Sequence, residues 1–205
     1  MPTIVLIRHG ENDLLVKGHL AGRMPGIGLN EKGRRQARDI AEALSKAPVK
    51  AVYSSPLERA METAEPIAQA LGLSVIPRSG LIEIDFGDWQ NRSLKQLHRL
   101  KLWKVVVRSP SLARFPGGET FAQAQSRIVD EIENLNASHN PKDTFVCVTH
   151  SDVIKLAVAY YLGLPLDMFQ RLVIAPASIT TINLLRDQVR LINLNQNIPS
   201  QCSDD

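Results

Sequence analysis

Cysteine is scarce in this sequence, and its scarcity excludes a small scaffold held together by disulfides. Two cysteines occur in 205 residues, and neither belongs to a CxxC pattern. Cys147 lies in the apolar run TFVCVTH and is predicted to be a buried, unreactive thiol. Cys202 lies in the polar stretch NIPSQCSDD, and no bridge between the two is expected. No basic segment followed by a long apolar one opens the chain, so a cytoplasmic location is the expectation.

A strong excess of charge and a long apolar run are also missing. The 24 basic and 21 acidic side chains leave a net charge of +3, whereas a nucleic-acid-binding protein would show a clustered basic face. No apolar run approaches the roughly 20 residues that span a bilayer. We therefore expect neither a nucleic acid nor a membrane as a partner. One local basic stretch forms either a solvated helix face or a cover over an anionic substrate. Its side chains are Arg92, Lys95, His98, Arg99, Lys101, Lys104 and Arg108.

Short apolar segments alternate with amphipathic ones, which is the pattern of an α/β protein. Strands are predicted at residues 3–9, 51–56, 73–77 and 144–150, with a closing hairpin at 178–185 and 189–195. Helices are predicted at residues 29–47, 57–72, 94–108, 120–139, 152–163 and 166–174. We expect a three-layer α/β/α fold with a mostly parallel central sheet. The expected single domain covers residues 1–198, and residues 199–205 are expected to be a mobile tail.

Arginines and histidines stand where the predicted strands end. Arg8 and His9 end the first strand, in IVLIRHG, and His150 ends the strand TFVCVTH. Arg59 follows the second strand, in SSPLERA. Ligands of parallel sheets bind at the carboxyl ends of the strands, so these side chains are predicted to meet on one rim. Two guanidiniums and two imidazoles suit a tetrahedral dianion such as phosphate, and a neutral imidazole can act as a nucleophile toward it.

Transfer of a phosphoryl group from an ester would also need an acid to protonate the leaving alkoxide. Glu83, Asp85 and Asp88, in the irregular segment after the third strand, are the candidates, and the pattern does not choose among them. A second interpretation makes His9, His150 and a carboxylate the ligands of a metal ion. It explains the histidines but leaves two arginines beside a cation, so the anion site is the favoured prediction.

The other histidines and the tryptophans are interpreted as structural. His19, His98 and His139 are expected to be polar surface, because a histidine outside a constellation most often has no chemical role. Trp89 and Trp103 are expected to pack against other side chains rather than to form a platform for a substrate.

The motifs of this chain resemble those of the histidine phosphatase superfamily, also called phosphoglycerate mutase-like. LIRHGEN is similar to the nucleophile motif of that family, and VYSSPLERAMETA to the segment with a phosphate-binding arginine. LIEIDFGDW resembles the proton-donor segment, and VTHSDVIK the second histidine motif. LNEKGRRQA and PGGETF resemble the starts of two of its helices. The resemblance extends over residues 3–195, nearly the whole chain.

The resemblance implies a role for each matching residue. His9 would be the phosphorylated nucleophile, and Arg8, Arg59 and His150 would complete the phosphate pocket. Glu83 would be the proton donor among the three candidate carboxyl groups. The family needs no metal ion, and the resemblance implies no cofactor.

Three places depart from the family pattern. Leu15 stands where members often have an asparagine that helps to hold phosphate, and Arg23 or a loop backbone N–H is the predicted substitute. Gln-Asn at 90–91 follows the tryptophan in place of Glu-Gly. Ser-Asp at 151–152 follows the second histidine in place of glycine.

The predicted function is hydrolysis of a small phosphorylated metabolite through a phosphohistidine intermediate. Classical phosphoglycerate mutases resemble the chain but carry a longer insertion before the PGGE-like segment, where residues 84–116 form the expected cover over this site. A phosphomutase and a non-catalytic protein that binds a phospho-ligand are the alternatives. The sequence leaves the oligomeric state open, since the apolar C-terminal hairpin would either close the sheet or pair with a partner, as in a homodimer.

Overall fold

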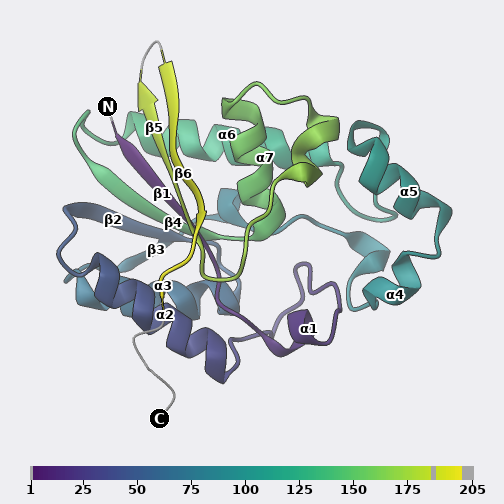
Figure 1. The fold of residues 1–205 in the computed structure, drawn as a ribbon, viewed down its shortest axis with the longest axis horizontal. Coiled ribbons are helices and arrows are strands. Elements are labelled where there is room, and N and C mark those ends of the chain that lie inside the picture. Colours follow the sequence, from purple (N-terminus) through teal and green to yellow (C-terminus); the bar gives the residue numbers. More distant parts are fainter. Residues whose placement is uncertain (1, 186–187, 200–205) are drawn as a thin grey trace.

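Six strands form one sheet in the order β3-β2-β4-β1-β5-β6, in a computed structural model that describes residues 2–185 and 188–199 (Figure 1). The strands are β1 (Thr3–Arg8), β2 (Val49–Ser54), β3 (Val75–Pro77), β4 (Thr144–Thr149), β5 (Ile179–Leu185) and β6 (Gln188–Gln196). The first four are parallel, and β5 and β6 form an antiparallel hairpin at one edge. The mostly parallel α/β sheet is thus confirmed.

Helices cover both faces of this sheet (Figure 1). The helices α2 (Glu31–Leu44) and α3 (Glu58–Ala70) share one buried apolar cluster with β1, β2 and β4. The helices α6 (Phe121–Ala137) and α7 (Ser151–Tyr161) share a second cluster with the opposite face of the same strands. The expected three layers are therefore present. None of the helices in the described part of the chain combines the length and apolar character needed to cross a bilayer.

The apolar runs of β1 and β4 are explained by burial on both faces. Ile4 and Leu6 face the cluster of α6 and α7, whereas Val5 and Ile7 face the cluster of α2 and α3. Burial of each such side chain contributes about 1.5–3 kcal/mol relative to exposure. Cys147 of β4 is fully buried, as predicted, and burial raises the pKa of its thiol. Cys202 and residues 200–205 of the predicted tail lie outside the described residues.

The register of the parallel strands places the two histidine motifs at one level. Arg8 of β1 lies opposite Thr149 of β4, so His9 and His150 both follow directly after the paired residues. The backbone N–H of His9 donates to the carbonyl of Thr149 over 2.9 Å. Two segments that are about 140 positions apart in sequence are thereby joined at the same edge of the sheet.

The segment between β3 and α6 differs in detail from the prediction. One helix was expected over residues 94–108, but α4 (Leu94–Leu97) and α5 (Lys101–Arg108) are separate, because Leu100 adopts an extended backbone with φ −77° and ψ 142°. Its basic side chains are exposed or half-buried, and none lines either cavity described below. The solvated-face interpretation of this stretch therefore fits, and the basic-cover interpretation does not.

Two further elements differ from the prediction, and the hairpin agrees with it. The short helix α1 (Asp13–Val16) was not predicted; the side chain of Asn12 caps it. Residues Leu166–Arg171 form a 3-10 helix, where a short helix was expected over 166–174. The C-terminal hairpin extends the sheet, because β5 pairs with β1. A homodimer through this hairpin stays a prediction.

Candidate active site

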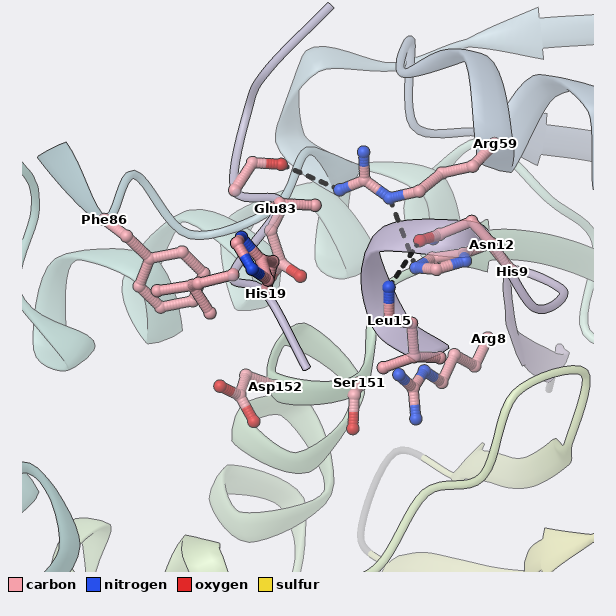
Figure 2. A pocket seen from close by; sticks show the side chains of 13 residues that line it. Arg8, His9, Asn12, Leu15, His19, Arg59, Glu83, Phe86, Ser151 and Asp152 are labelled. Atoms are coloured by element: carbon pink, nitrogen blue, oxygen red, sulfur yellow. Dashed lines mark hydrogen bonds between the residues drawn. The ribbon is translucent and has the colours of Figure 1, made fainter. Parts of the chain in front are cut away.

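A cavity of about 210 Å³ lies at the carboxyl ends of β1, β2 and β4 (Figure 2). Four of the predicted residues line it: Arg8, His9, Arg59 and Glu83. His150 is fully buried directly behind them, with its ring centroid 5.2 Å from that of His9. The fold therefore brings together the two arginines, the two histidines and one carboxyl group that the sequence analysis singled out.

The ring of His9 is held in one orientation. Its Nδ1 lies 2.7 Å from the carbonyl oxygen of Gly10, so Nδ1–H donates there and Nε2 keeps its lone pair. That lone pair accepts a long hydrogen bond, 3.3 Å, from Nε–H of Arg59. Burial, together with the charges of Arg59 and Arg8, holds the pKa of His9 well below its ordinary value. A neutral imidazole is the form that a nucleophile requires, and Nε2 would exchange this long hydrogen bond for phosphorus when it attacks.

Close backbone packing fixes the loop that follows His9. A Cβ at Gly10 would lie 2.7 Å from the carbonyl oxygen of Gly33 in α2, so only glycine fits between the two backbones. The N–H of Gly10 donates to Oγ1 of Thr63 in α3 over 3.0 Å. The glycine of the RHG motif thus anchors the end of β1 against both helices of one layer.

Arg59, from the first turn of α3, connects the two histidines. Its Nη2 donates to the carbonyl of Gly22 over 2.8 Å and lies 3.3 Å from Nδ1 of His150, while its Nε approaches His9. Arg8 donates from Nη1 to the carbonyl of Ile174 over 2.6 Å. The buried Nη1 of Arg59 and Nε of Arg8 have no acceptor among the described residues. Both guanidiniums therefore have a donor left over for an oxyanion in the cavity.

His150 stands at the N-terminus of α7, where backbone N–H groups also favour an anion. Its Nε2 lies 2.8 Å from Oγ of Ser55, and its Nδ1 lies 3.8 Å from Oε2 of Glu83. Burial and the charge of Arg59 hold the pKa of His150 well below its ordinary value. Its ring is therefore neutral here, and a bound dianion would favour its protonation.

Of the three carboxyl groups that the pattern left open, Glu83 alone lines this cavity. Its side chain is 13% exposed, and burial, helped by the negative charge of Asp152, raises its pKa to about 7. Asp85 instead accepts from the N–H of Gly87, and Asp88 is exposed. The geometry and the pKa both point to Glu83 as the group that holds a proton near neutral pH.

The structure does not bring Arg23 into the cavity lining, where it was a predicted phosphate ligand. Its Nε donates to the backbone carbonyl of Glu83 over 2.8 Å, and its Nη2 donates to Glu119 over 3.0 Å. Glu119 also accepts from Arg127 over 2.8 Å and from the N–H of Asp85 over 2.9 Å. Arg23 and Glu119 thus form a network that holds the Glu83 segment from behind.

Glu119→Gln is expected to loosen this network. The variant removes the charge shared by two arginines, and hydrogen bonds to charged groups contribute about 1.5–3 kcal/mol each. We expect the free energy of unfolding to fall by about 2 kcal/mol in urea titrations. Glu42→Gln, on the exposed face of α2, is the matched control and should change it by less than about 0.5 kcal/mol. Equal free energies of unfolding for the two variants would show that the network around Glu119 does not stabilise the fold.

Several lining residues were missed by the sequence analysis. His19 was expected to be polar surface, but it lines the cavity with Nδ1 3.0 Å from the carbonyl of Asn91. Asn12 lines it and caps α1 by accepting from the N–H of Leu15 over 2.9 Å. Leu15, which the sequence analysis had singled out as a departure from the family pattern, also lines the cavity with an apolar side chain. The sequence around Asn12 has the pattern of a helix N-cap and could have predicted the role of this residue. The position of His19 depends on tertiary packing alone.

The alternative of a metal site is disfavoured by the charges around the histidines. The guanidinium of Arg59 lies 3.3 Å from both imidazoles and would repel a cation placed between them. In the described ranges, no group of three or more His, Cys, Asp or Glu side chains could hold a metal ion. The arrangement suits an anion.

Comparison with known proteins agrees with this geometry. A family model described as the histidine phosphatase superfamily (branch 1) matches residues 4–197. The chain belongs to the histidine phosphatase superfamily. Membership confirms the resemblance of the motifs, and the match covers nearly the same residues.

Members of the histidine phosphatase superfamily that are similar to this chain carry different activities in their names. Phosphoserine phosphatase 1 of Hydrogenobacter thermophilus is 30% identical over 95% of this chain and 92% of its own length. A 2,3-bisphosphoglycerate-dependent phosphoglycerate mutase of Thermoplasma acidophilum is 33% identical over 90% of this chain and 88% of its own. The solved structure of a mycobacterial glucosyl-3-phosphoglycerate phosphatase with VO3 has a TM-score of 0.87 and 28% identity, covering 95% and 99% of the two chains. Both phosphatases and a mutase are therefore relatives of this histidine phosphatase superfamily member.

Proposed function

We propose that this protein is a metal-independent phosphomonoesterase that hydrolyses a small phosphorylated metabolite through a phosphohistidine at His9. The observation that carries the proposal is the contact of Arg59 with both His9 and His150 beside the carboxyl group of Glu83. These groups supply a nucleophile, positive charge for the phosphoryl oxygens and an acid with a pKa near neutrality.

In the first step, Nε2 of His9 attacks phosphorus as the ester P–O bond breaks. Arg8 and Arg59 neutralise charge on the phosphoryl oxygens, and His150 adds a donor once it takes up a proton beside the dianion. The leaving alkoxide takes the proton of Glu83 and departs as an alcohol. The products of this step are phosphohistidine and an ionised Glu83.

In the second step, the carboxylate of Glu83 takes a proton from water, and the resulting hydroxide attacks phosphorus. The P–N bond breaks, and its electron pair returns to Nε2 of His9. Inorganic phosphate leaves, and Glu83 carries its proton again. The cavity of about 210 Å³ has room for a phosphoryl group and for water, whose share of liquid volume is about 30 Å³ per molecule.

Hydrolysis is favoured over a mutase reaction by the charges on the cavity wall. A mutase must hold a bisphosphate, and its second phosphate needs its own cations. In the described part of the chain, Arg8 and Arg59 are the two guanidiniums of this lining, and they belong to the phosphoryl site. The wall beyond them contributes no further arginine or lysine among the described residues, and its carboxyl groups, Glu83 and Asp152, offer no positive charge to a second phosphate.

A substrate panel with and without a bisphosphate primer tests this proposal. We expect release of inorganic phosphate from phosphomonoesters without a primer, and equal rates in a chelator, since arginines supply the positive charge. Strict dependence on the primer with no net phosphate release would establish the mutase. No turnover combined with tight phosphate binding would establish a non-catalytic binding protein.

The pKa of Glu83 sets the expected pH dependence. As the acid of the first step, Glu83 must hold its proton, and its protonated fraction falls as pH rises through about 7. For an alkyl phosphate, kcat/KM should therefore fall about tenfold per pH unit above that value. The substrate dianion forms with a pKa of about 6. The fall in kcat/KM therefore occurs at a higher pH than the ionisation of the ester.

Glu83→Gln is the matched variant for the pH profile. Glutamine has the shape of a protonated glutamate but no proton to give, so kcat for an alkyl ester should fall by about 10²–10⁴. The limb near pH 7 should disappear from its kcat/KM profile. An unchanged limb in Glu83→Gln would assign the titration to another group and contradict the role of Glu83.

A further inference from the structure

A second cavity of about 380 Å³ adjoins the phosphoryl site. The two cavities share Leu20, Phe86 and Asp152 as lining residues, so they meet at a common wall. Figure 2 shows Phe86 and Asp152 on the side of the site away from Arg59. The second cavity is therefore the neighbouring space for the alcohol portion of an ester whose phosphoryl group lies between Arg8 and Arg59.

The second cavity is lined mainly by aromatic and aliphatic side chains. Trp89 and Trp103 stack with ring centroids 6.0 Å apart, and Trp89 also contacts the edge of Phe115, with centroids 5.3 Å apart. These residues come from the segment between β3 and α6, which was expected to cover the site. Both tryptophans were expected to be packing residues; they do pack, and they also form a wall of this cavity.

The polar groups of the second cavity are few, and the charged ones are paired. Nζ of Lys155 lies 3.1 Å from Oδ1 of Asp152 and 3.5 Å from Oε1 of Gln170. The lysine is thereby neutralised and is not a free site for a second phosphate. Protein interiors are close-packed, and an apolar void carries a cost that grows with its volume. An apolar cavity of this size beside a phosphoryl site has the character of a ligand pocket.

We propose that this cavity binds the alcohol portion of the substrate and that the enzyme prefers phosphomonoesters of apolar, ring-bearing alcohols. The inference rests on the proposed function and narrows its substrate class. A ring stacks favourably against indole and phenyl faces, whereas the hydration of a carboxylate or a sugar would be lost there without matching partners. Gln170 offers one hydrogen bond to a polar edge of such a ring.

Two esters that have the same kind of leaving group, but differ in the ring that the second cavity would bind, allow the effect of binding to be measured apart from the chemical step. We expect kcat/KM for 2-phenylethyl phosphate to exceed that for ethyl phosphate by about tenfold or more, because burial of a phenyl group contributes about 1.5–3 kcal/mol. Val107→Trp, which places a large side chain at the wall of the cavity, should reduce this ratio by about tenfold. Leu112→Trp is the control: its position is 77% exposed outside the lining, and the ratio should not change.

A binding measurement distinguishes failure of this inference from failure of the proposed function. The two tryptophans of the sequence both line the second cavity, so tryptophan emission reports on it. We expect 2-phenylethylphosphonate, which cannot be hydrolysed, to change that emission and to bind about tenfold more tightly than ethylphosphonate. Equal hydrolysis of the two esters with equal phosphonate binding would overturn the inference while hydrolysis stands. Tight, selective phosphonate binding without hydrolysis would support the cavity and refute the proposed activity.

Discussion

Replacing His9 with alanine is expected to lower kcat for phosphomonoester hydrolysis by at least about 10⁴-fold, as loss of a nucleophile does in other enzymes. No other side chain of the site offers the same chemistry. His150 is fully buried outside the cavity lining, and its Nε2 lies 2.8 Å from Oγ of Ser55. Phosphate release by the purified variant, measured against the wild type on the same ester, checks the prediction.

A histidine outside the site provides the control for His9→Ala. His98 is exposed beside Trp103, away from the phosphoryl cavity, and His98→Ala should keep the wild-type rate toward ethyl phosphate within about twofold. His9→Ala should also keep its folded state, because the hydrogen bond from His9 to Gly10 is local and the apolar core is untouched. A folded His9→Ala variant within about tenfold of the wild-type rate would contradict the nucleophile assignment.

Arg59→Ala is expected to cost about 10³-fold or more in kcat/KM, which is the scale found for an arginine that stabilises a phosphoryl transition state. Arg59 is 1% exposed, and its guanidinium lies 3.3 Å from a ring nitrogen of each histidine. Its removal deletes charge from the phosphoryl oxygens and also removes the contacts that orient both imidazoles. Steady-state kinetics with the substrate panel measures the effect.

Arg59→Lys separates charge from geometry at this position. Lysine keeps the charge but lacks the planar fork that reaches His9, His150 and Gly22 together. We expect it to recover at most about a tenth of the wild-type kcat/KM. Recovery to the wild-type kcat/KM would show that a positive charge at position 59 is sufficient for catalysis and that the guanidinium is not needed to orient the two histidines. Unfolding midpoints of both variants show whether lost activity reflects lost fold.

The strand-end histidines were predictable because parallel strands share one carboxyl edge. Arg8 and His9 follow one apolar run and His150 follows another, and the register of β1 and β4 then leaves little freedom in where they meet. The three layers follow from the same alternation of apolar runs and amphipathic segments. The choice of Glu83 came from the resemblance, since three carboxyl groups in an irregular segment look alike in the sequence.

The parts that escaped prediction depend on contacts between distant segments. The pKa of Glu83 is set by burial and by Asp152, some 70 positions away in the sequence. Arg23 is turned toward Glu119 instead of the cavity by partners that no local pattern reveals. The helical spacing of apolar residues continues almost unchanged from α4 to α5. The sequence therefore gives no sign of the break, which the structure shows as the extended backbone of Leu100.

Trapping the phosphorylated enzyme tests the central claim most directly. The Glu83→Gln variant mixed with 4-nitrophenyl phosphate should accumulate phosphoenzyme, because a good leaving group needs little help from the acid while hydrolysis of phosphohistidine still needs the base. Mass spectrometry after quenching in alkali should place one phosphoryl group on His9. Turnover without a phosphoryl group on His9, or a phosphoryl group on any other residue, would contradict the account.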